Sequence, residues 1–564
     1  MYTSQRSVAP KKLERKNLET MAVIVLVITF MLISCWNLGA TQIPTTSFKV
    51  KSGESFYLDF KEPFRVKFLY LLYKGELNFK LLVGRPADWR KVNSIKISDY
   101  YRWINLWIGE KTRFIKFSFS TSNGEIVEIV AIDENDRPIK IHSIIDEKSE
   151  LKELWKMIDE QDKVSLPPSY LTETYFDEVY YVRAAEDYLR GEDPYEWTHP
   201  PLGKLIITAG ISILGYSPFS WRIIGVLFGA LLIPLIYFLG KSIFGTFLGG
   251  FIPAFLVSFD FMHYTMARIA TVDTYLVFFL TASHYFFFKY IKNVRKSRSK
   301  FFTSSLLLSI IFFALGFSTK WTALFGFFGQ LVLFALINLR DNDRTAEEML
   351  GKVKMFSRYL PYMLVWSLLV IPLYFLTFVP YMAIGHNLED VLQRQWMMFN
   401  YHSMLKTVHP FSSEWWSWPF ILKPVWFYCS GVRGETRSTI TCMGNPAIWY
   451  FGFISILFVT FTALKKKRLN PLFISVIFFS QWLPYALLSR PLFLYHFYPN
   501  LPFLCLAATF VLRRLSAKNL GKALISSYMV LVVLLFGLYF PVISGYPVSE
   551  EWINLLRVLN SWVF

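Results

Sequence analysis

The sequence predicts a polytopic α-helical membrane protein with a β-rich domain inserted near its N-terminus. Three observations lead to this fold class. Hydrophobic residues make up 54% of the 564 residues and the mean hydropathy is +0.35, which is more apolar than a typical soluble protein. Runs of about twenty apolar residues, the length of a membrane-spanning helix, recur along the chain. One stretch near the N-terminus instead alternates apolar and polar residues, which is the pattern of β-strands.

The net charge of +18 does not indicate a nucleic-acid-binding protein. Lys and Arg gather in short segments between apolar runs, as expected for the cytoplasmic loops of a membrane protein. We therefore attribute the charge to membrane topology and expect the lipid bilayer, and no nucleic acid, as a partner. The four cysteines are too few for a disulfide framework or a thiolate metal site. Cys429 and Cys442 share a loop that we place outside, where a disulfide and free thiols are equally open alternatives.

Residues 1–40 are predicted to hold a cytoplasmic N-terminus and the first membrane helix. Several basic residues precede the apolar run that begins at Met21. That run is longer than the core of a signal peptide and has no small-residue cleavage site. We expect an uncleaved span over 21–39.

Residues 41–165 are predicted to form an extracytoplasmic antiparallel β-sandwich. Alternating segments such as SFYLDF and TRFIKFSFS are separated by turn signals such as Ser-Asn-Gly. Residues 146–162 have the spacing of a short amphipathic helix, which would link the domain back to the membrane.

Residues 166–217 are predicted to form the catalytic first extracytoplasmic loop, with juxtamembrane helices. The loop contains an adjacent acidic pair, Asp177 and Glu178, and a His-Pro-Pro-Leu-Gly-Lys segment that begins at His199. The apolar stretch 202–216 is too short to cross a bilayer, and we expect it to lie along the interface. Carboxylates at a membrane boundary, with basic residues nearby, suit a reaction on a lipid-linked phosphate compound.

The rest of the chain is predicted to cross the membrane ten more times, which gives about eleven helices and an outside C-terminus. Basic segments serve as cytoplasmic anchors, and the apolar residues between neighbouring anchors suffice for one out-and-back hairpin. The anchors are Lys241 and residues 292–300, 340–358, 465–468 and 513–522. The predicted spans after the first are 218–240, 245–263, 273–290, 301–318, 321–339, 359–380, 447–463, 470–488, 499–512 and 523–541.

This count divides the remainder of the chain into four regions. Residues 218–380 form a transmembrane core, and residues 381–446 a large extracytoplasmic loop. Residues 447–541 hold the C-terminal transmembrane helices, and 542–564 an extracytoplasmic tail.

Seven motifs in the same order resemble those of the protein O-mannosyltransferase family, membrane glycosyltransferases of the GT-C class. Asp177-Glu178 stands where the family has its catalytic acids, and HPPLGK matches the family signature almost letter for letter. The remaining motifs are FSWRIIGVLFG with Arg222, ARIATVDTYLVFF with Arg268 and Asp273, STKWTALF with Lys320, YHSMLKTVHPFSSEWWSWPF, and SRPLFLYHFYPNLPF with Arg490. Motifs in family order are far more specific than any one of them alone.

The resemblance implies a GT-C fold and a particular reaction. Mannose would move from a polyprenyl- or dolichyl-phosphate donor to Ser or Thr hydroxyls of exported proteins, with inversion at the anomeric carbon. The sequence departs from the family in two respects. A β-domain precedes the acidic pair, and the loop 381–446 is too short to carry the β-trefoil domain of eukaryotic members.

The chemistry of such a transfer assigns roles to the acidic pair. A base must deprotonate the acceptor hydroxyl, and Asp177, with Glu178 beside it, is the candidate. The alternative is that both acids only begin a helix, where they suit the positive end of the helix dipole.

Cations must stabilise the departing lipid phosphate. Arg222 and Lys320 are the best candidates, each at the outer end of a predicted helix, and Arg490 is a third. The alternative for them is contact with lipid headgroups. His199 and Lys204 either touch the phosphate or belong to a rigid turn that shapes the site.

Asp273 and Arg268 are candidates for binding the acceptor or a divalent cation. The alternative, slightly favoured, is an internal ion pair that fixes their loop. The sequence has no dense His, Asp and Glu cluster, so the use of a metal stays open. His402, His409 and His496 are interpreted as packing or hydrogen-bonded histidines. Trp415, Trp416 and Trp418 are interpreted as an interfacial aromatic belt, with stacking on a sugar ring as the less favoured alternative.

Two other functions fit part of the sequence. A GT-C transferase with the same donor class could act on a lipid or envelope glycan, as the aminoarabinose transferases do. A lipid transporter or flippase is less favoured, because transporters place polar sites at the bilayer midplane, often on repeated halves. For each transferase function we expect a multi-pass protein of the cell membrane with an extracytoplasmic active site.

Overall fold

The structure is a computed structural model of the whole chain. It describes residues 8–120, 122–146, 150–297, 304–340, 364–365, 367–431, 436–466, 468–515 and 519–564. The chain divides into two units, which are described separately. The helical unit comprises Met1–Trp36, Ala184–Ala209 and Arg222–Phe564, and the sheet unit comprises Asn37–Arg183 and Gly210–Trp221.

Apolar helices of the helical unit follow the predicted spans closely. They are α1 (Val8–Cys35), α4 (Pro218–Phe244), α5 (Phe247–Ser258), α6 (Phe261–Ala267), α7 (Asp273–Ser297), α8 (Ser304–Phe317), α9 (Ala323–Arg340), a helix over Ser367–Leu376, α13 (Pro446–Lys466), α14 (Leu469–Trp482), α15 (Leu501–Leu515) and α16 (Asn519–Ser544). Of the predicted span 359–380, residues 359–363 and 366 lie outside the described residues. So do residues 298–300 of the basic segment 292–300 and residues 341–358 of the basic segment 340–358.

The described helices are those of a membrane protein. Four of them, α1, α4, α13 and α16, are long and apolar enough to cross a bilayer. The pair α5–α6 is long and apolar enough only when taken together, and it bends by 63° at a short break, as in a broken span or a re-entrant loop. Shorter apolar helices occupy further predicted spans, so the number of eleven crossings stays a prediction. Large exposed side chains such as Leu32 and Leu534, 69% and 64% accessible, indicate surfaces that face lipid.

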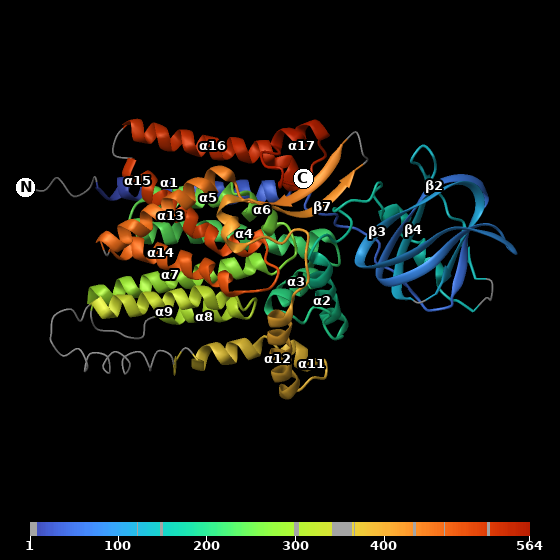
Figure 1. Cartoon of the computed structure of the whole chain (residues 1–564), viewed down its shortest axis with the longest axis horizontal. Coiled ribbons are helices and arrows are strands. Elements are labelled where there is room, and N and C mark those ends of the chain that lie inside the picture. The colour runs from blue at the N-terminus through green and yellow to red at the C-terminus, as the bar shows by residue number, and fades with distance from the viewer. Residues whose placement is uncertain are drawn as a thin grey trace, which may run out of the picture. The chain divides into compact units, whose positions relative to one another are not determined.

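Close helix packing fixes the core of the helical unit. Helices α7, α8 and α9 lie side by side, and α13 packs against α14 and α15 (Figure 1). Between α4 and α5 the backbones approach closely at small residues. A Cβ at Gly250 would lie 2.6 Å from the carbonyl oxygen of Tyr237, so only glycine fits there.

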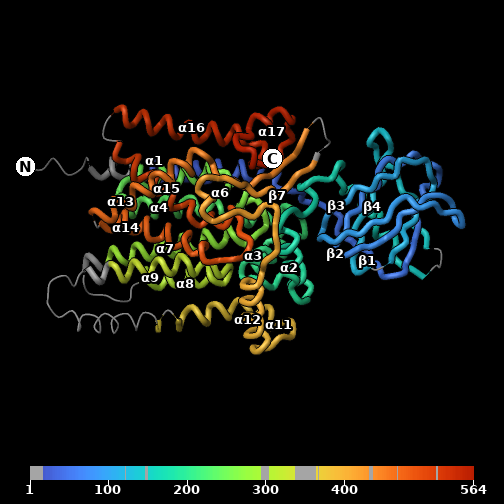
Figure 2. The backbone as a smooth tube through the Cα atoms, in the orientation of Figure 1, coloured from blue at the N-terminus to red at the C-terminus, as the bar shows by residue number. Residues whose placement is uncertain are grey.

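The sheet unit contains one connected antiparallel sheet of six strands in the region 41–165. The strands are β1 (Phe48–Val50), β2 (Ser55–Arg85), β3 (Asp88–Phe119), β4 (Asn123–Ile132), β5 (Pro138–Ile139) and β6 (Ser143–Ile145). The path runs β1–β4–β2–β3, with β5 beside β4 and β6 beside β2. The long strands β2 and β3 curve as they pair (Figure 2). Their inward residues, including Leu69, Leu71 and Ile115, form a buried apolar core.

The predicted amphipathic helix over 146–162 is wrong. The described part of this segment forms two short 3-10 turns, η1 (Leu154–Met157) and η2 (Gln161–Lys163). Tertiary contacts override the helical pattern here. Leu154 and Met157 pack into the core of the sheet, and the Glu160 carboxylate accepts hydrogen bonds from the backbone N–H groups of Thr45 and Thr46.

The large loop 381–446 is ordered by helices and a hairpin. It contains α12 (Leu388–Met404), which follows α11 (Val379–Ala383), then η3 (Trp415–Phe420), β7 (Val425–Gly431) and β8 (Arg437–Cys442). The hairpin register places Cys429 opposite Thr439, and Cys442 opposite Val425. Both thiols are free, so the alternative without a disulfide holds in this structure. Two 3-10 turns, η4 (Leu483–Leu487) and η5 (Leu494–Asn500), precede α15, and α17 (Glu550–Leu556) lies near the C-terminus.

Candidate functional site

The acidic pair opens helix α2 (Glu178–Arg190). Glu178 is fully buried, and its carboxylate accepts the N–H of Tyr175 at 3.2 Å. In return, the N–H of Glu178 donates to the Tyr175 carbonyl at 3.2 Å. Phe176, next to Asp177, has a left-handed backbone with φ of 50°, an uncommon conformation for a bulky residue. Such strain recurs at functional sites, because the surrounding structure must hold it in place.

Strand β3 holds the segment that leads into the acidic pair. The N–H of Thr174 donates to the Tyr101 carbonyl at 3.1 Å, and its hydroxyl donates to the Tyr100 carbonyl. One residue earlier, the Glu173 carboxylate accepts the N–H of Trp103 at 2.9 Å. The inserted sheet therefore does more than precede the acidic pair in sequence, because it fixes the backbone three residues before Asp177.

The HPPLGK segment is built around a buried ion pair that the sequence reasoning missed. Lys204, at the start of α3 (Leu202–Leu214), is 2% exposed and lies 2.8 Å from the Glu196 carboxylate. Its ammonium also donates to the carbonyls of Glu196 and His199, each at 2.7 Å. These contacts use all three ammonium hydrogens. Glu196 was not singled out from the sequence, and its position three residues before His199 was the only signal.

Glu196 also orients the residues that precede the two prolines. Its carboxylate accepts the N–H of Thr198 at 2.9 Å and contacts Nδ1 of His199 at 3.0 Å. Burial alone would raise the pKa of the Glu196 carboxyl, but Lys204 and His199 outweigh it and hold the pKa well below its usual range. Burial lowers the pKa of His199 despite the pull of Glu196 in the other direction. Glu196 is therefore the anion at the centre of this turn.

His402 on α12 joins this turn to Arg490. Its Nε2–H donates to the Thr198 carbonyl at 2.7 Å, which leaves Nδ1 as the acceptor for the Arg490 guanidinium. Burial lowers the pKa of His402 to about 3, and the nearby His199 and Arg490 add to the shift. Of the two interpretations of His402, packing or hydrogen bonding, the structure shows the second. His402 is a polar bridge between the Thr198 carbonyl and Arg490.

Lys320 lies just before α9 and pairs with Asp273, the first residue of α7. Its ammonium is 2.8 Å from the Asp273 carboxylate, and the two side chains are only 10% and 7% exposed. Lys320 also lies 5.8 Å from the centre of the Tyr495 ring. Its charge lowers the pKa of both His199 and His402, so Lys320 belongs to the same electrostatic neighbourhood. This neighbourhood, with Lys320, Arg490, His199 and His402, is called the cationic cluster below.

The other two arginines singled out from the sequence, Arg222 and Arg268, are both buried. Arg222 on α4 is fully buried. Arg268, at the end of α6, donates to the carbonyls of Trp36 at 3.0 Å and Ser544 at 3.3 Å, and contacts the Tyr264 hydroxyl. These contacts tie α6 to the ends of α1 and α16. Asp273 forms its ion pair with Lys320, whereas the sequence had suggested Arg268, in the same loop, as its partner.

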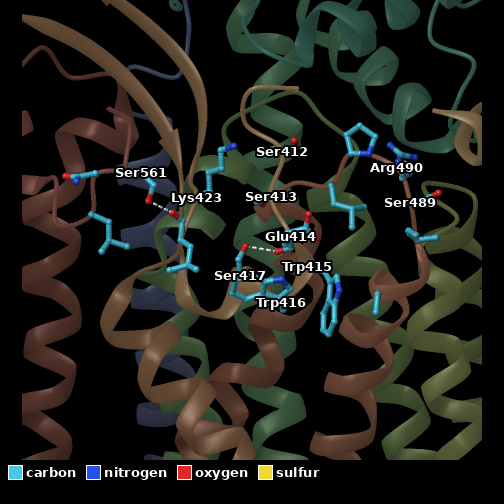
Figure 3. Close-up of a pocket in the computed structure, with 17 residues that line it drawn as sticks. Ser412, Ser413, Glu414, Trp415, Trp416, Ser417, Lys423, Ser489, Arg490 and Ser561 are labelled. Carbon is cyan, nitrogen blue, oxygen red and sulfur yellow. Dashed lines mark hydrogen bonds between the residues drawn. The ribbon is translucent and has the colours of Figure 1, made fainter. Parts of the chain in front are cut away.

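An open cleft of about 870 Å³ begins beside Arg490 (Figure 3). Its walls come from η3, from the segment between η4 and η5, and from the C-terminal residues. Trp415, Trp416, Glu414 and several serines line it, and Lys423 lies on the side toward Ser561. The hydrogen bond from the Ser561 hydroxyl to the Leu422 carbonyl anchors the C-terminal wall. Trp415 and Trp416 thus line a cleft, a placement that the aromatic-belt interpretation did not anticipate.

Within the part of the chain that the structure describes, no three His, Cys, Asp or Glu residues gather in a way that could hold a metal ion. Asp273 is engaged by Lys320, and His402 by Thr198 and Arg490. The question of a metal therefore stays where the sequence left it.

Comparisons with known proteins identify the class of protein. The solved structure of the Saccharomyces cerevisiae protein O-mannosyltransferase Pmt1–Pmt2 complex, bound to the sugar donor, matches with a TM-score of 0.56 at 14% sequence identity. The match covers 69% of this chain and 89% of that chain. The fold is therefore that of the polytopic GT-C membrane proteins.

Sequence comparison narrows the class. The family model described as dolichyl-phosphate-mannose-protein mannosyltransferase matches residues 198–366, and the C-terminal four-transmembrane region of protein O-mannosyltransferase matches residues 387–562. The polyprenol-phosphate-mannose–protein mannosyltransferase of Mycobacterium tuberculosis is 25% identical over 422 residues, 64% of this chain and 80% of the relative. That of Corynebacterium glutamicum is 24% identical over 425 residues, 64% of this chain and 81% of the relative. The chain belongs to the protein O-mannosyltransferase family.

The first of the two family models begins at residue 198 and the second at residue 387, so neither includes the region 41–165 or the acidic pair. The assignment of Asp177 and Glu178 rests on the motif order seen in the sequence and on the strained, tethered backbone described above.

Proposed function

We propose that this protein is an inverting glycosyltransferase. It moves mannose from a polyprenyl- or dolichyl-phosphate donor to Ser or Thr hydroxyls of exported proteins. The named activities of the relatives from Mycobacterium tuberculosis and Corynebacterium glutamicum support the donor and the kind of acceptor. The observation that carries the proposal is the pair of cations in the cationic cluster, Lys320 and Arg490, because cations held in place by Asp273 and His402 suit an anionic lipid phosphate.

In the proposed reaction, Asp177 acts as the general base. It accepts the proton of the acceptor hydroxyl while that oxygen attacks the anomeric carbon of the mannose. The bond between the anomeric carbon and the phosphate oxygen breaks on the opposite face, and the polyprenyl phosphate leaves with the electron pair. Glu178 is buried and bonded to the backbone of Tyr175, which suits it to shaping the start of α2. We assign proton transfer to Asp177 and positioning to Glu178.

Lys320 and Arg490 are the proposed ligands of the donor phosphate, and Arg222 and His199 remain candidates beside them. Lys320 and Arg490 are held by Asp273 and His402, so their heads are oriented before substrate arrives. Lys204 is different, because its three hydrogens are already donated within the HPPLGK turn. We propose that Lys204 positions His199 and that Asp273 positions Lys320.

Beside Arg490, the cleft with Trp415 and Trp416 is the proposed path of the acceptor polypeptide. Its volume of about 870 Å³ accommodates a short peptide segment. Its tryptophans and serines offer stacking surfaces and hydrogen bonds of the kind that bind varied peptide sequences.

The membrane arrangement that this function requires is also a proposal. Eleven helices cross the plasma membrane, the sheet unit is a β-sandwich outside it, and the catalytic residues face the extracytoplasmic side. In this arrangement Asp177 lies on the extracytoplasmic side, where the exported acceptor is.

The test is transfer of labelled mannose by the purified protein in detergent. Polyprenyl-phosphate mannose and a Ser/Thr-rich peptide are supplied, and label is followed in peptide and lipid fractions. Asp177→Asn is expected to lower the rate by about a hundredfold or more. Asp162→Asn, an exposed acid on η2, is the matched control and should retain the rate.

Two outcomes would contradict the proposal. Full transfer by a folded Asp177→Asn protein would exclude Asp177 as the base. Label that enters only a lipid or glycan fraction in membranes of the native host would exclude the protein acceptor and favour the lipid-acceptor alternative.

A further inference from the structure

A second cavity lies at the ends of α14 and α15 that are remote from Arg490, which stands between these two helices in the chain. Its volume is about 490 Å³, and it is bounded by the C-terminal ends of α4, α13 and α15 and the start of α14. Phe510, which lines it, follows the first residue of α15, Leu501, by nine residues, which at 1.5 Å per residue is about 14 Å. This cavity, called the basic pocket below, is therefore separate from the proposed donor site.

Positive charge dominates the basic pocket. Four cationic side chains line it, Lys466, Arg468, Arg513 and Arg514, and none of the described residues that line it is acidic. Two of them are held against aromatic walls. The Arg513 guanidinium lies 5.1 Å from the centre of the Phe244 ring, and that of Arg514 lies 4.3 Å from the Phe510 ring. Stacking orients a guanidinium without using its hydrogens, so the donors of Arg514 stay available for a ligand.

A partly buried hydrogen bond holds one side of the pocket in place. The Asn470 side-chain amide donates to the Ile243 carbonyl at 2.6 Å, which joins the start of α14 to the end of α4. Basic residues at helix C-termini also suit the helix dipole, and this alone would explain their presence on separate helices. It would not explain why residues of α13, α14 and α15 converge on one cavity.

An apolar surface leads away from the pocket along α13. Phe458, Phe461 and Leu464 follow at intervals of three residues, and so lie along one face. They are 43%, 61% and 73% exposed, which marks a surface that faces lipid tails. A cationic pocket at the end of such a surface matches the two parts of a phospholipid, a phosphate headgroup and its acyl chains.

We propose that the basic pocket binds the headgroup of an anionic phospholipid, whose acyl chains lie along the exposed face of α13. Phosphate oxygens accept hydrogen bonds from Arg514, while Lys466, Arg468 and Arg513 contribute charge. This end of the helices is the one predicted to face the cytoplasm, where anionic lipids are attracted by basic residues near the membrane. The bound lipid joins α4 to the C-terminal helices α13–α15.

The test measures retention of lipid by the full-length protein. Native mass spectrometry after incubation with phosphatidylglycerol, cardiolipin or phosphatidylcholine gives the affinity for each lipid. Lys466→Gln with Arg514→Gln is expected to weaken binding of the anionic lipids by about thirtyfold, and leave phosphatidylcholine unchanged. The matched control is Lys465→Gln with Lys289→Gln, which removes the same charge from cations outside the pocket. Both doubles should retain mannosyl transfer, which shows that they fold.

Each other result overturns the proposal. Equal loss of anionic lipid in both doubles would mean that net charge, and not the pocket, attracts the lipid. Equal retention in both would mean that the pocket holds no lipid. Inorganic phosphate or ATP that binds with the same affinity and competes with phosphatidylglycerol would assign the pocket to a free phosphate compound.

Discussion

At the scale of single residues, the ion pair between Lys204 and Glu196 decides whether Lys204 positions its neighbours in the HPPLGK turn or binds the donor phosphate. Both side chains are almost fully buried, at 2% and 7% exposure, and each is the main charge partner of the other. Lys204→Met should therefore destabilise the protein by about 3–5 kcal/mol, because it leaves the Glu196 charge buried and unpaired. The midpoint of thermal unfolding in detergent measures this.

The double variant Lys204→Met, Glu196→Gln is the control for that prediction. Removing both charges should recover much of the lost stability, since no buried ion is left without a partner. A Lys204→Met protein of unchanged stability, with a raised KM for the donor, would contradict the positioning role and return Lys204 to the donor phosphate.

His402 predicts how stability depends on pH. Its pKa is lowered from 6.5 to about 3 in the folded protein, so the unfolded chain binds a proton that the folded one does not. Stability from the neutral imidazole is complete above pH 6.5 and is lost as the pH falls from 6.5 toward 3. The slope from this one proton is at most about 1.4 kcal/mol per pH unit. The unfolding midpoint should fall between pH 7 and 5, and fall less in His402→Gln, whose amide still donates to Thr198.

At the scale of elements, the contact between β3 and the segment before α2 predicts a catalytic role for the sheet unit. Thr174→Val removes the hydroxyl bond to the Tyr100 carbonyl and loosens the backbone three residues before Asp177. A small displacement of a catalytic base is expected to lower kcat by tenfold or more, roughly, with little change in KM for the donor. Steady-state transfer kinetics measure the two constants separately.

Thr172→Val is the matched control for the β3 contact. The Thr172 hydroxyl donates to the Ser169 carbonyl at 3.2 Å and accepts the Ser169 N–H at 3.5 Å, both within the same turn, so its loss should leave kcat unchanged. Equal kcat for Thr174→Val and wild type would show that the sheet unit does not position the base.

The helices were the most predictable elements, and the segment 146–162 shows why prediction failed elsewhere. Long apolar runs such as those of α4 and α16 can satisfy their backbone only as helices in a membrane, so composition decides them. The polar segment 146–162 had a helical spacing. The hydrogen bonds that the Glu160 carboxylate accepts from Thr45 and Thr46, far away in sequence, outweighed that weak preference. Local pattern could not reveal them.

The motifs of the candidate site could be predicted from the sequence, but the side-chain contacts that join them could not. Asp177, Lys320 and Arg490 stand in motifs that resemble the family, so order along the chain singled them out. Glu196 and His402 act through partners 8 and 88 residues away, and a contact of that kind leaves no periodic signal. The separation of 88 residues between His402 and Arg490 is also why the sequence could not decide between packing and hydrogen bonding for His402.

At the scale of the whole molecule, charge and chemistry divide between the two ends of the helical unit. The cationic cluster lies at the start of α7 and before α9, and the basic pocket at the ends of α13 and α15. If the proposed topology is correct, these ends face opposite sides of the membrane. Native Cys429 is exposed on β7, in the large loop that is predicted to lie outside, and Lys465 is an exposed residue at the other end of α13.

This geometry predicts which thiols a membrane-impermeant maleimide reaches. In intact cells or spheroplasts the reagent should label the wild-type protein at Cys429, and Cys429→Ser should lose that labelling. Lys465→Cys in the Cys429→Ser background should be labelled only after the membrane is permeabilised, because positive loops are retained in the cytoplasm. Labelling of both positions from the same side would require an even number of crossings between β7 and the end of α13. Labelling of Cys429 only after permeabilisation would place the large loop in the cytoplasm, separate the donor site from the exported acceptor and exclude the proposed reaction.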